Sequence, residues 1–166
     1  AAIMKGDKIG FIDRLGRVTI EPRFELERGQ RSLPSFSEGL VPVKLGGLYG
    51  FADSSGRLVI EPRYQSAQGF REGLAAVRVD DKTGYIDREG RMVITPRFDA
   101  YWPPSFHEGL AAVRTGNAKT GTWGYINNQG KMVINPQFER VESFSERLAA
   151  VRIGDATTGK WGYISR

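Results

Sequence analysis

The sequence predicts an all-β fold of tandem repeats, each about 34–40 residues long and built from three short antiparallel strands. Three landmarks that return in the same order support this prediction. The first is a glycine followed by an aromatic residue, and its occurrences are separated by 40, 34, 40 and 38 residues. Periods of this length are typical of solenoids, propellers and open arrays. The pairs are Gly10-Phe11, Gly50-Phe51, Gly84-Tyr85, Gly124-Tyr125 and Gly162-Tyr163.

Two further landmarks lie between successive glycine-aromatic pairs. One is a proline that a single residue separates from an aromatic residue: Pro22 and Phe24, Pro62 and Tyr64, Pro96 and Phe98, Pro136 and Phe138. The other is a phenylalanine followed by a short strand that contains a leucine and a valine. Its members are Phe36, Phe70, Phe106 and Phe144, leading to Leu40 and Val43, Leu74 and Val77, Leu110 and Val113, Leu148 and Val151.

The third repeat illustrates the three predicted strands in order. The first strand runs from Leu74 to Val79, and its small residues Ala75-Ala76 allow a neighbouring layer to approach closely. The second strand holds Gly84 to Asp87, and the third runs from Arg91 to Phe98. Short strands at regular spacing, separated by turn residues, are typical of all-β proteins.

The turn between the second and third strands has a fixed composition. Asp or Asn occupies its first position and glycine its fourth, as in Asp87 to Gly90. This pattern predicts a type I turn with a glycine bulge, because the Asx side chain caps the turn and glycine accepts a positive φ. We therefore expect structural roles for these acids. The other copies are Asp13 to Gly16, Asp53 to Gly56 and Asn127 to Gly130.

The third strand alternates in polarity, as a half-buried strand does. Met92, Ile94, Pro96 and Phe98 are predicted to share the core face, and Arg91, Val93, Thr95 and Arg97 the opposite face. Proline has no N–H for a sheet ladder, so this strand is expected to be an edge or to leave the sheet at the proline.

These motifs together resemble the bacterial WG-repeat family. The resemblance rests on Trp123-Gly124-Tyr125-Ile126, Trp161-Gly162-Tyr163-Ile164, the Val-Ile-x-Pro strand and the Phe-x-Glu-Gly-Leu-Ala-Ala-Val strand, and it covers nearly the whole chain. It implies an all-β repeat domain, commonly one part of a larger protein, with no defined chemistry for most members. Ile9, Tyr49 and Thr83 stand where the family has tryptophan, and Arg147 replaces a repeated glycine.

The landmarks divide one domain, residues 1–166, into units at about 1–39, 40–73, 74–109, 110–147 and a partial unit at 148–166. Residues 1–5 align with residues 149–153, so both termini fall at matching places in the repeat. A closed propeller usually completes a split blade from its two termini. We therefore predict an open β-repeat array, with a β-propeller as the alternative, and a fragment of a longer protein.

The composition excludes several kinds of chemistry. The chain has no cysteine and one histidine, His107, which excludes disulfides and thiolate zinc sites and disfavours a metal site or a Ser-His-Asp triad. His107 stands where other repeats have Ser37, Arg71 and Ser145, so an exposed, uninvolved side chain is expected. The repeated acids, including Glu38, Glu72, Glu108 and Glu146, are better explained by turn capping or arginine pairing than by catalysis. We expect no enzyme activity and no cofactor.

Basic residues also form columns, within a chain of net charge +5. One column follows the turn glycine (Arg17, Arg57, Arg91, Lys131), and the other follows the proline (Arg23, Arg63, Arg97). Both lie on the polar face of the third strand, so stacked repeats predict a cationic stripe for nucleic acid, an acidic glycan or a lipid surface. The competing expectation is that Glu21 and Glu61, on the same face, neutralise these arginines.

Features that break the repeat are the better candidates for specific function. Tyr101-Trp102, followed by two prolines, suits an interface anchor or a sugar-stacking platform, although Trp102 covering the core is an equal alternative. The sequence thus favours a non-catalytic protein-interaction or scaffold module, and a binder of polyanions or cell-envelope glycans is the alternative. Apolar runs are too short for a membrane span, so a soluble protein is expected, cytoplasmic or in the cell envelope.

Overall fold

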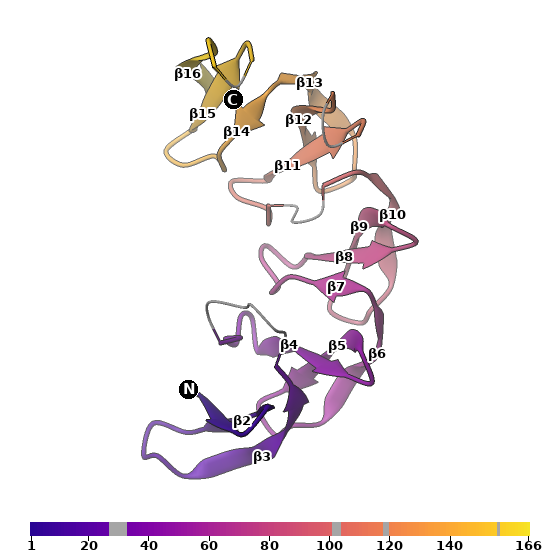
Figure 1. Ribbon diagram of the computed structural model, residues 1–166, viewed down its shortest axis with the longest axis vertical. Coiled ribbons are helices and arrows are strands. Elements are labelled where there is room, and N and C mark those ends of the chain that lie inside the picture. Colours follow the sequence, from indigo (N-terminus) through magenta and orange to yellow (C-terminus); the bar gives the residue numbers. More distant parts are fainter. Residues whose placement is uncertain (27–32, 101–103, 118–119, 156) are drawn as a thin grey trace. The chain divides into compact units, whose positions relative to one another are not determined.

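The computed structural model describes residues 1–26, 33–100, 104–117, 120–155 and 157–166. These residues form strands β1 to β16 and contain no helix (Figure 1). The strands belong to several antiparallel sheets, and none of these sheets closes into a barrel. The prediction of an all-β open repeat array is confirmed. Among the described residues, no helix is long and apolar enough to cross a membrane.

The chain forms two compact units, Ala1–Phe70 and Arg71–Arg166. In the first unit, six strands follow one another in a single antiparallel sheet in the order of the sequence. These strands are β1 (Ala2–Lys5), β2 (Lys8–Ile12), β3 (Val18–Glu25), β4 (Leu40–Leu45), β5 (Leu48–Asp53) and β6 (Leu58–Tyr64). The short strand β7 (Ser66–Ala67) follows near the end of this unit.

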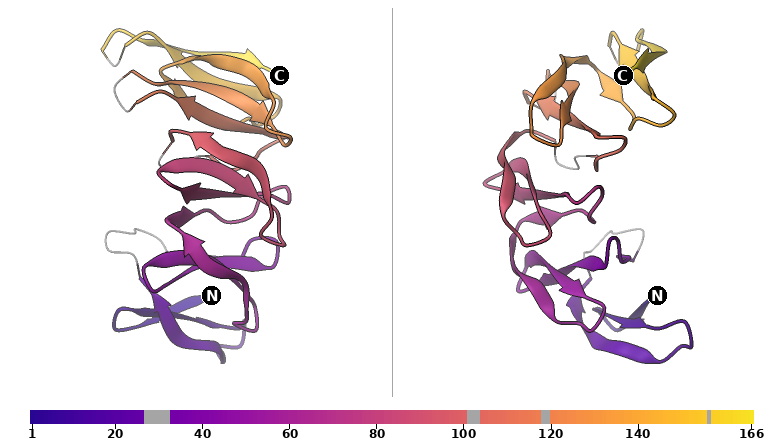
Figure 2. Two further views of the ribbon diagram at one scale, coloured as in Figure 1. Left: turned by 90° about the vertical axis from the view of Figure 1, so that its right-hand side faces the viewer. Right: turned by 180° about the vertical axis from the view of Figure 1, so that it is seen from behind.

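The second unit contains strands of three antiparallel sheets. Strands β8 (Ala75–Val79), β9 (Lys82–Ile86) and β10 (Met92–Phe98) belong to one sheet. Strands β11 (Leu110–Thr115), β12 (Thr122–Asn127) and β13 (Met132–Phe138) form the next. The last sheet contains β14 (Arg140–Val141), β15 (Leu148–Ile153) and β16 (Lys160–Ser165) (Figure 2). The three strands predicted for the third repeat are confirmed.

The Asx-Gly turns adopt the predicted conformation. At Asp87 the carbonyl accepts the amide of Gly90 at 3.0 Å, and Gly90 has a φ of 80°. One carboxylate oxygen of Asp87 accepts the amides of Glu89 and Arg91 at 3.1 and 2.8 Å. The same side-chain capping occurs at Asp13, Asp53 and Asn127. The structural role predicted for these residues is confirmed.

The third strand is bulged, which changes its predicted alternation. In β10, Ile94 lies opposite Tyr85 and Phe98 opposite Thr83, so four positions of β10 span two of β9. Pro96 lies within this bulge, where the ladder is interrupted, as its missing N–H predicts. Ile94 and Phe98 are buried as expected, but Met92 is exposed. Its assignment to the core was wrong, because a further register shift separates Met92 from Ile94.

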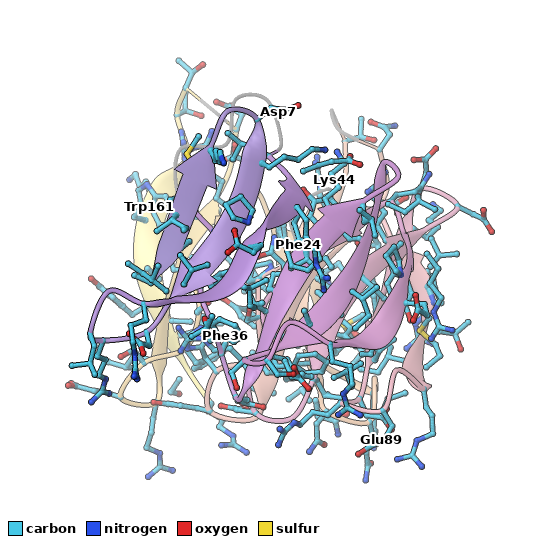
Figure 3. The ribbon with its side chains drawn as sticks, turned by 90° about the horizontal axis from the view of Figure 1, so that it is seen from below. Asp7, Phe24, Phe36, Lys44, Glu89 and Trp161 are labelled. Atoms are coloured by element: carbon cyan, nitrogen blue, oxygen red, sulfur yellow. The ribbon has the colours of Figure 1, made fainter. Side chains whose placement is uncertain are left out.

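Each hydrophobic core is shared by two consecutive repeats. Ala111 and Val113 of β11 pack with Tyr85 of the preceding repeat, whereas Leu110 and Ala112 pack in the following core. Successive residues of a strand point to opposite faces, so the Leu-Ala-Ala-Val strand is buried on both sides. This explains its small apolar side chains. In the first unit, buried Phe24 and half-buried Lys44 can be compared in Figure 3.

An aromatic pair recurs in four repeats of the described chain. The aromatic residue after the repeated glycine meets the phenylalanine that precedes the next first strand, with ring centroids about 5 Å apart, a favourable edge or tilted arrangement. The pairs are Phe11 and Phe36 at 5.0 Å, Phe51 and Phe70 at 4.8 Å, Tyr85 and Phe106 at 5.0 Å, and Tyr125 and Phe144 at 4.9 Å. Two of the three landmarks are therefore contact partners in three dimensions.

A repeated glutamate joins neighbouring repeats within the second unit. His107 and Leu110 exchange backbone hydrogen bonds around a two-residue turn, where Glu108 and Gly109 have φ values of 53° and 75°. Such a turn normally favours asparagine or glycine at its first position. Glu108 occupies it because its carboxylate accepts the amide of Arg147 in the next repeat at 3.0 Å. Glu72 accepts the amide of Gly109 at 2.9 Å in the same way.

Arg147 is strained relative to the glycine found in equivalent turns. Its φ is 65°, a left-handed conformation that costs a non-glycine residue about 1 kcal/mol. We expect Arg147→Gly to raise the free energy of unfolding by about that amount, measured by urea denaturation. Arg147→Lys keeps a Cβ in this left-handed backbone conformation, so it should leave stability unchanged. Equal stabilisation by both changes would contradict this explanation.

Candidate functional site

The first basic column is paired with the turn acids. The guanidinium Nε donates to the Asp carboxylate of its own turn in three repeats: Arg17 to Asp13 at 2.7 Å, Arg57 to Asp53 at 3.2 Å and Arg91 to Asp87 at 2.7 Å. At Asp13, this side-chain hydrogen bond and the backbone amide of Arg17 lower the carboxyl pKa below its usual value. The neutralising partners are thus the turn acids, whereas Glu21 and Glu61 were expected. In the fourth repeat, the backbone amide of Lys131 binds Asn127.

The second basic column joins neighbouring repeats. Arg97 donates a hydrogen bond to the carbonyl of Gly130, in the turn of the next repeat, at 2.6 Å. Its guanidinium also lies 5.1 Å from the ring centroid of Phe98, a cation–π distance. Arg23 makes the same two contacts, with Gly56 and Phe24, and Arg63 lies over the ring of Tyr64. These contacts give the column a structural role in packing and, at Arg23 and Arg97, in joining repeats.

We expect Arg97→Ala to lower the free energy of unfolding by about 2 kcal/mol, because it removes a charge-assisted hydrogen bond and a cation–π contact. Arg91→Ala is the matched control from the other column. Its side chain is 74% exposed and its ion pair with Asp87 lies at the surface, so no measurable change is expected. Urea unfolding of both variants checks this, and equal effects would contradict the assignment.

The sequence also singled out Tyr101, Trp102 and His107. Tyr101 and Trp102 lie outside the described residues. His107 is half-buried, and its backbone makes two hydrogen bonds with Leu110 in the two-residue turn. Within the described ranges, no group of three or more acidic, histidine or cysteine side chains is placed to hold a metal ion.

A hollow of about 410 Å³ lies in the second unit and contains two of the three tryptophans of the chain. Its walls come from β11, β12, β14 and β16, with the residues just before and after β14. Trp123 and Trp161 occupy the same position in consecutive repeats, each opposite the last-but-one residue of the preceding strand. The lining residues are Arg114, Trp123, Glu139, Arg140, Val141, Glu142 and Trp161.

The two indoles differ in exposure. Trp123 is half-buried, since it lies opposite Phe138 of β13, whereas Trp161 is 52% exposed. Among the described residues, neither indole N–H donates a hydrogen bond. An indole offers a large apolar face together with one donor, which suits a ligand that both stacks and accepts a hydrogen bond.

Two arginines and two glutamates line the hollow, but the two glutamates differ in their ion pairs. Glu139 pairs with the largely buried Arg152 at 3.2 Å, and its other oxygen lies 3.7 Å from Arg140. The Nε of Arg114 donates to the carbonyl of Gly121 at 3.4 Å. Within the part of the chain that the structure describes, the carboxylate of Glu142 has neither a hydrogen bond nor an ion pair.

The backbone fixes the position of Glu142. Its amide donates to the carbonyl of Ala150 at 2.9 Å, and its carbonyl accepts the hydroxyl of Tyr125 at 2.7 Å. Burial, together with the negative charge of Glu142, raises the pKa of Tyr125, which keeps this hydroxyl protonated as a donor. These two bonds fix the backbone of Glu142 at the hollow, and its side chain is exposed.

The family model for the WG containing repeat matches residues 9–49, 49–82, 84–117 and 123–161. The chain belongs to the WG-repeat family. None of the curated proteins compared with this WG-repeat chain matches it. Among solved structures, it is similar to one titled "Crystal structure of the eukaryotic initiation factor", with a TM-score of 0.60 and 12% identity. The similarity covers 99% of this chain and 48% of that chain, about half of its length, and it concerns the fold alone.

The tryptophans that define the WG repeat line the hollow, and the sequence reasoning did not select them. The sequence did contain one indication of this site, because tryptophan occupies the position in only two repeats. The other three have Ile9, Tyr49 and Thr83 there, and these residues are buried. A position that is core in three repeats and tryptophan in two consecutive repeats indicates a local surface feature. Finding Glu139 and Glu142 required the fold, since nothing in their sequence setting marks them.

Proposed function

We propose that this WG-repeat chain is a non-catalytic protein-interaction or scaffold module whose binding site is the hollow around Trp123 and Trp161. The observation that carries the proposal is that two tryptophans of consecutive repeats line one hollow together with Arg114 and Arg140. Tryptophan and arginine are the side chains most enriched in protein–protein binding hot spots. A bacterial source is part of the proposal, as the resemblance of the motifs implies.

The repeated residues support this choice because the fold already uses them. Turn acids hold the first arginine column, and the second column binds the next repeat. Residues that differ between repeats, such as Trp123 and Trp161, are therefore the better candidates for binding. We propose the lining side chains as the contacts. Their indoles would form the apolar centre of the interface and their charged groups its rim, which is the usual composition of a protein interface.

Binding of a polyanion or an acidic glycan is the second candidate. It is favoured by the exposure of the first column, in which Arg91 and its counterparts remain about three-quarters exposed despite their ion pairs. Such binding weakens steeply as salt rises, because counterions are released on association. An interface anchored by tryptophan lacks this steep dependence.

Affinity capture with the full-length protein from its source cell tests the proposal. We expect partner proteins that resist nuclease treatment and moderate salt with the wild type, and that are absent with Trp161→Ala. The matched control is Tyr163→Ala, because Tyr163 is 77% exposed and does not line the hollow. Capture that is lost with salt or nuclease, or that is indifferent to Trp161→Ala, would favour the second candidate.

A further inference from the structure

We propose that the hollow is a docking groove for an extended, proline-containing peptide that carries a lysine or arginine beside its prolines. This inference rests on the proposed function and specifies its partner. The prolines would stack on Trp123 and Trp161, and the basic side chain would pair with Glu142.

The aromatic pair is the first element of the argument. Trp123 and Trp161 come from equivalent positions of β12 and β16, so the repeat itself places two indoles along one hollow. Proline-rich segments dock in aromatic-lined grooves because the polyproline II helix is already extended and loses little entropy on binding. A half-buried indole beside an exposed one provides two apolar surfaces for successive prolines.

The free donors are the second element. A polyproline II segment has no internal hydrogen bonds, so its carbonyls are available to accept hydrogen bonds from the protein that binds it. Neither indole N–H of the hollow has an acceptor among the described residues. Each indole can therefore both stack on a proline ring and donate to a peptide carbonyl.

The carboxylates of the hollow favour a basic residue beside the prolines of the ligand. Glu139 already faces Arg152 and Arg140, at 3.2 and 3.7 Å. Glu142 has no such partner in the described ranges, and its backbone bonds to Ala150 and Tyr125 fix the point from which its exposed side chain extends. A cation from the ligand would complete the pairing, and the indoles would add cation–π attraction. An anionic ligand would instead meet the unpaired carboxylate of Glu142.

The test uses short capped peptides with two proline pairs and one variable residue, measured by fluorescence anisotropy against the full chain. The variable residue is Arg, Lys, Leu or Glu, and a glycine-substituted peptide removes the polyproline II conformation. The arginine peptide is expected to bind best and the glutamate and glycine peptides worst. A neutral oligosaccharide series and a single-stranded nucleic acid are tested in parallel.

Three variants locate the binding. Trp161→Ala is expected to weaken the arginine peptide about tenfold or more, as loss of a central aromatic anchor does. Glu142→Gln should weaken the arginine and lysine peptides to the level of the leucine peptide and leave the leucine peptide unchanged. Tyr163→Ala should bind like the wild type. Trp161 is half exposed, so circular dichroism of its alanine variant should match the wild type.

The proposal is overturned if no peptide binds at millimolar concentration, if binding ignores Trp161→Ala, or if the glutamate peptide equals the arginine peptide. Tryptophan-dependent binding of the oligosaccharides or of nucleic acid in place of the peptides also overturns it. If captured partner proteins still depend on Trp161 while every peptide fails, the interaction module stands and only the peptide class is wrong.

Discussion

Replacing Gly84 by alanine is expected to lower the free energy of unfolding by about 3 kcal/mol, the upper end of the cost of inserting a carbon into packed structure. A Cβ at this position would lie 2.5 Å from the carbonyl oxygen of Ile94 and 2.8 Å from the nitrogen of Pro96. Both atoms belong to the backbone of the bulged third strand. A flexible side chain can move away from a new carbon, but this backbone is tied to β9 on either side of the bulge, where Ile94 lies opposite Tyr85 and Phe98 opposite Thr83.

Gly162 is the matched control, since it occupies the same position of the motif in the last repeat. No atom lies within 4 Å of a Cβ built there. We expect Gly162→Ala to change stability by less than about 0.5 kcal/mol, as for a surface substitution. Urea unfolding followed by circular dichroism compares the two variants. Comparable losses would mean that the glycine is needed for backbone conformation, and the crowding explanation would fail.

The same crowding explains why the glycine of the WG motif repeats. Gly10, Gly50 and Gly124 would also place a Cβ against the carbonyl of the third-strand isoleucine and the nitrogen of the following proline. None of these glycines has a positive φ. The motif glycine is therefore required by the close approach of one strand to another, and the bulge at the proline brings the two backbones together.

Replacing Phe106 by alanine is the second change for which we expect a large effect, a loss of about 4 kcal/mol in the free energy of unfolding. Its ring is 1% exposed and meets the ring of Tyr85 with centroids 5.0 Å apart. Removing it leaves a cavity in a core that two repeats share, and it removes the aromatic contact. The buried ring of Tyr85 would then lose the aromatic ring that packs against it.

Phe36 provides the comparison from the same column. It makes an equivalent pair with Phe11 at 5.0 Å but is 37% exposed, so Phe36→Ala removes less buried surface. We expect a loss of about 2 kcal/mol or less, scaled from the apolar area that is buried. Chemical denaturation of both variants measures the difference. A loss at Phe36 equal to that at Phe106 would show that the aromatic contact, and not burial, dominates.

The local features that the sequence predicted correctly are those set by neighbouring residues. Asp87 and Gly90 define their turn through hydrogen bonds and dihedral angles that lie within four residues. Strand β10 was found because alternation and proline placement act along one segment. Met92 was assigned to the wrong environment, because a register shift depends on the partner strand and leaves no mark in the alternation itself.

The candidate site was less accessible to sequence reasoning. Tyr101 and Trp102 were selected because they interrupt the repeat, and they lie outside the described residues. The arginine columns were selected as a cationic stripe, but Arg97 donates to Gly130 and Arg91 to Asp87. A column of like residues in a repeat protein shows that every unit needs that residue, and it does not show whether the need is for binding or for joining units.

The sequence by itself determined the repeat length, the order of the strands, the Asx-Gly turns and membership of the WG-repeat family, because each depends on residues close together in the chain or on their recurrence. Only the tertiary structure decided which columns join repeats and which side chains line the hollow. Glu108 reaches Arg147 across 39 positions, and Trp123 and Trp161 line the same hollow. Such contacts follow from how one hairpin stacks on the next, which is set by packing between repeats and not by the pattern within any of them.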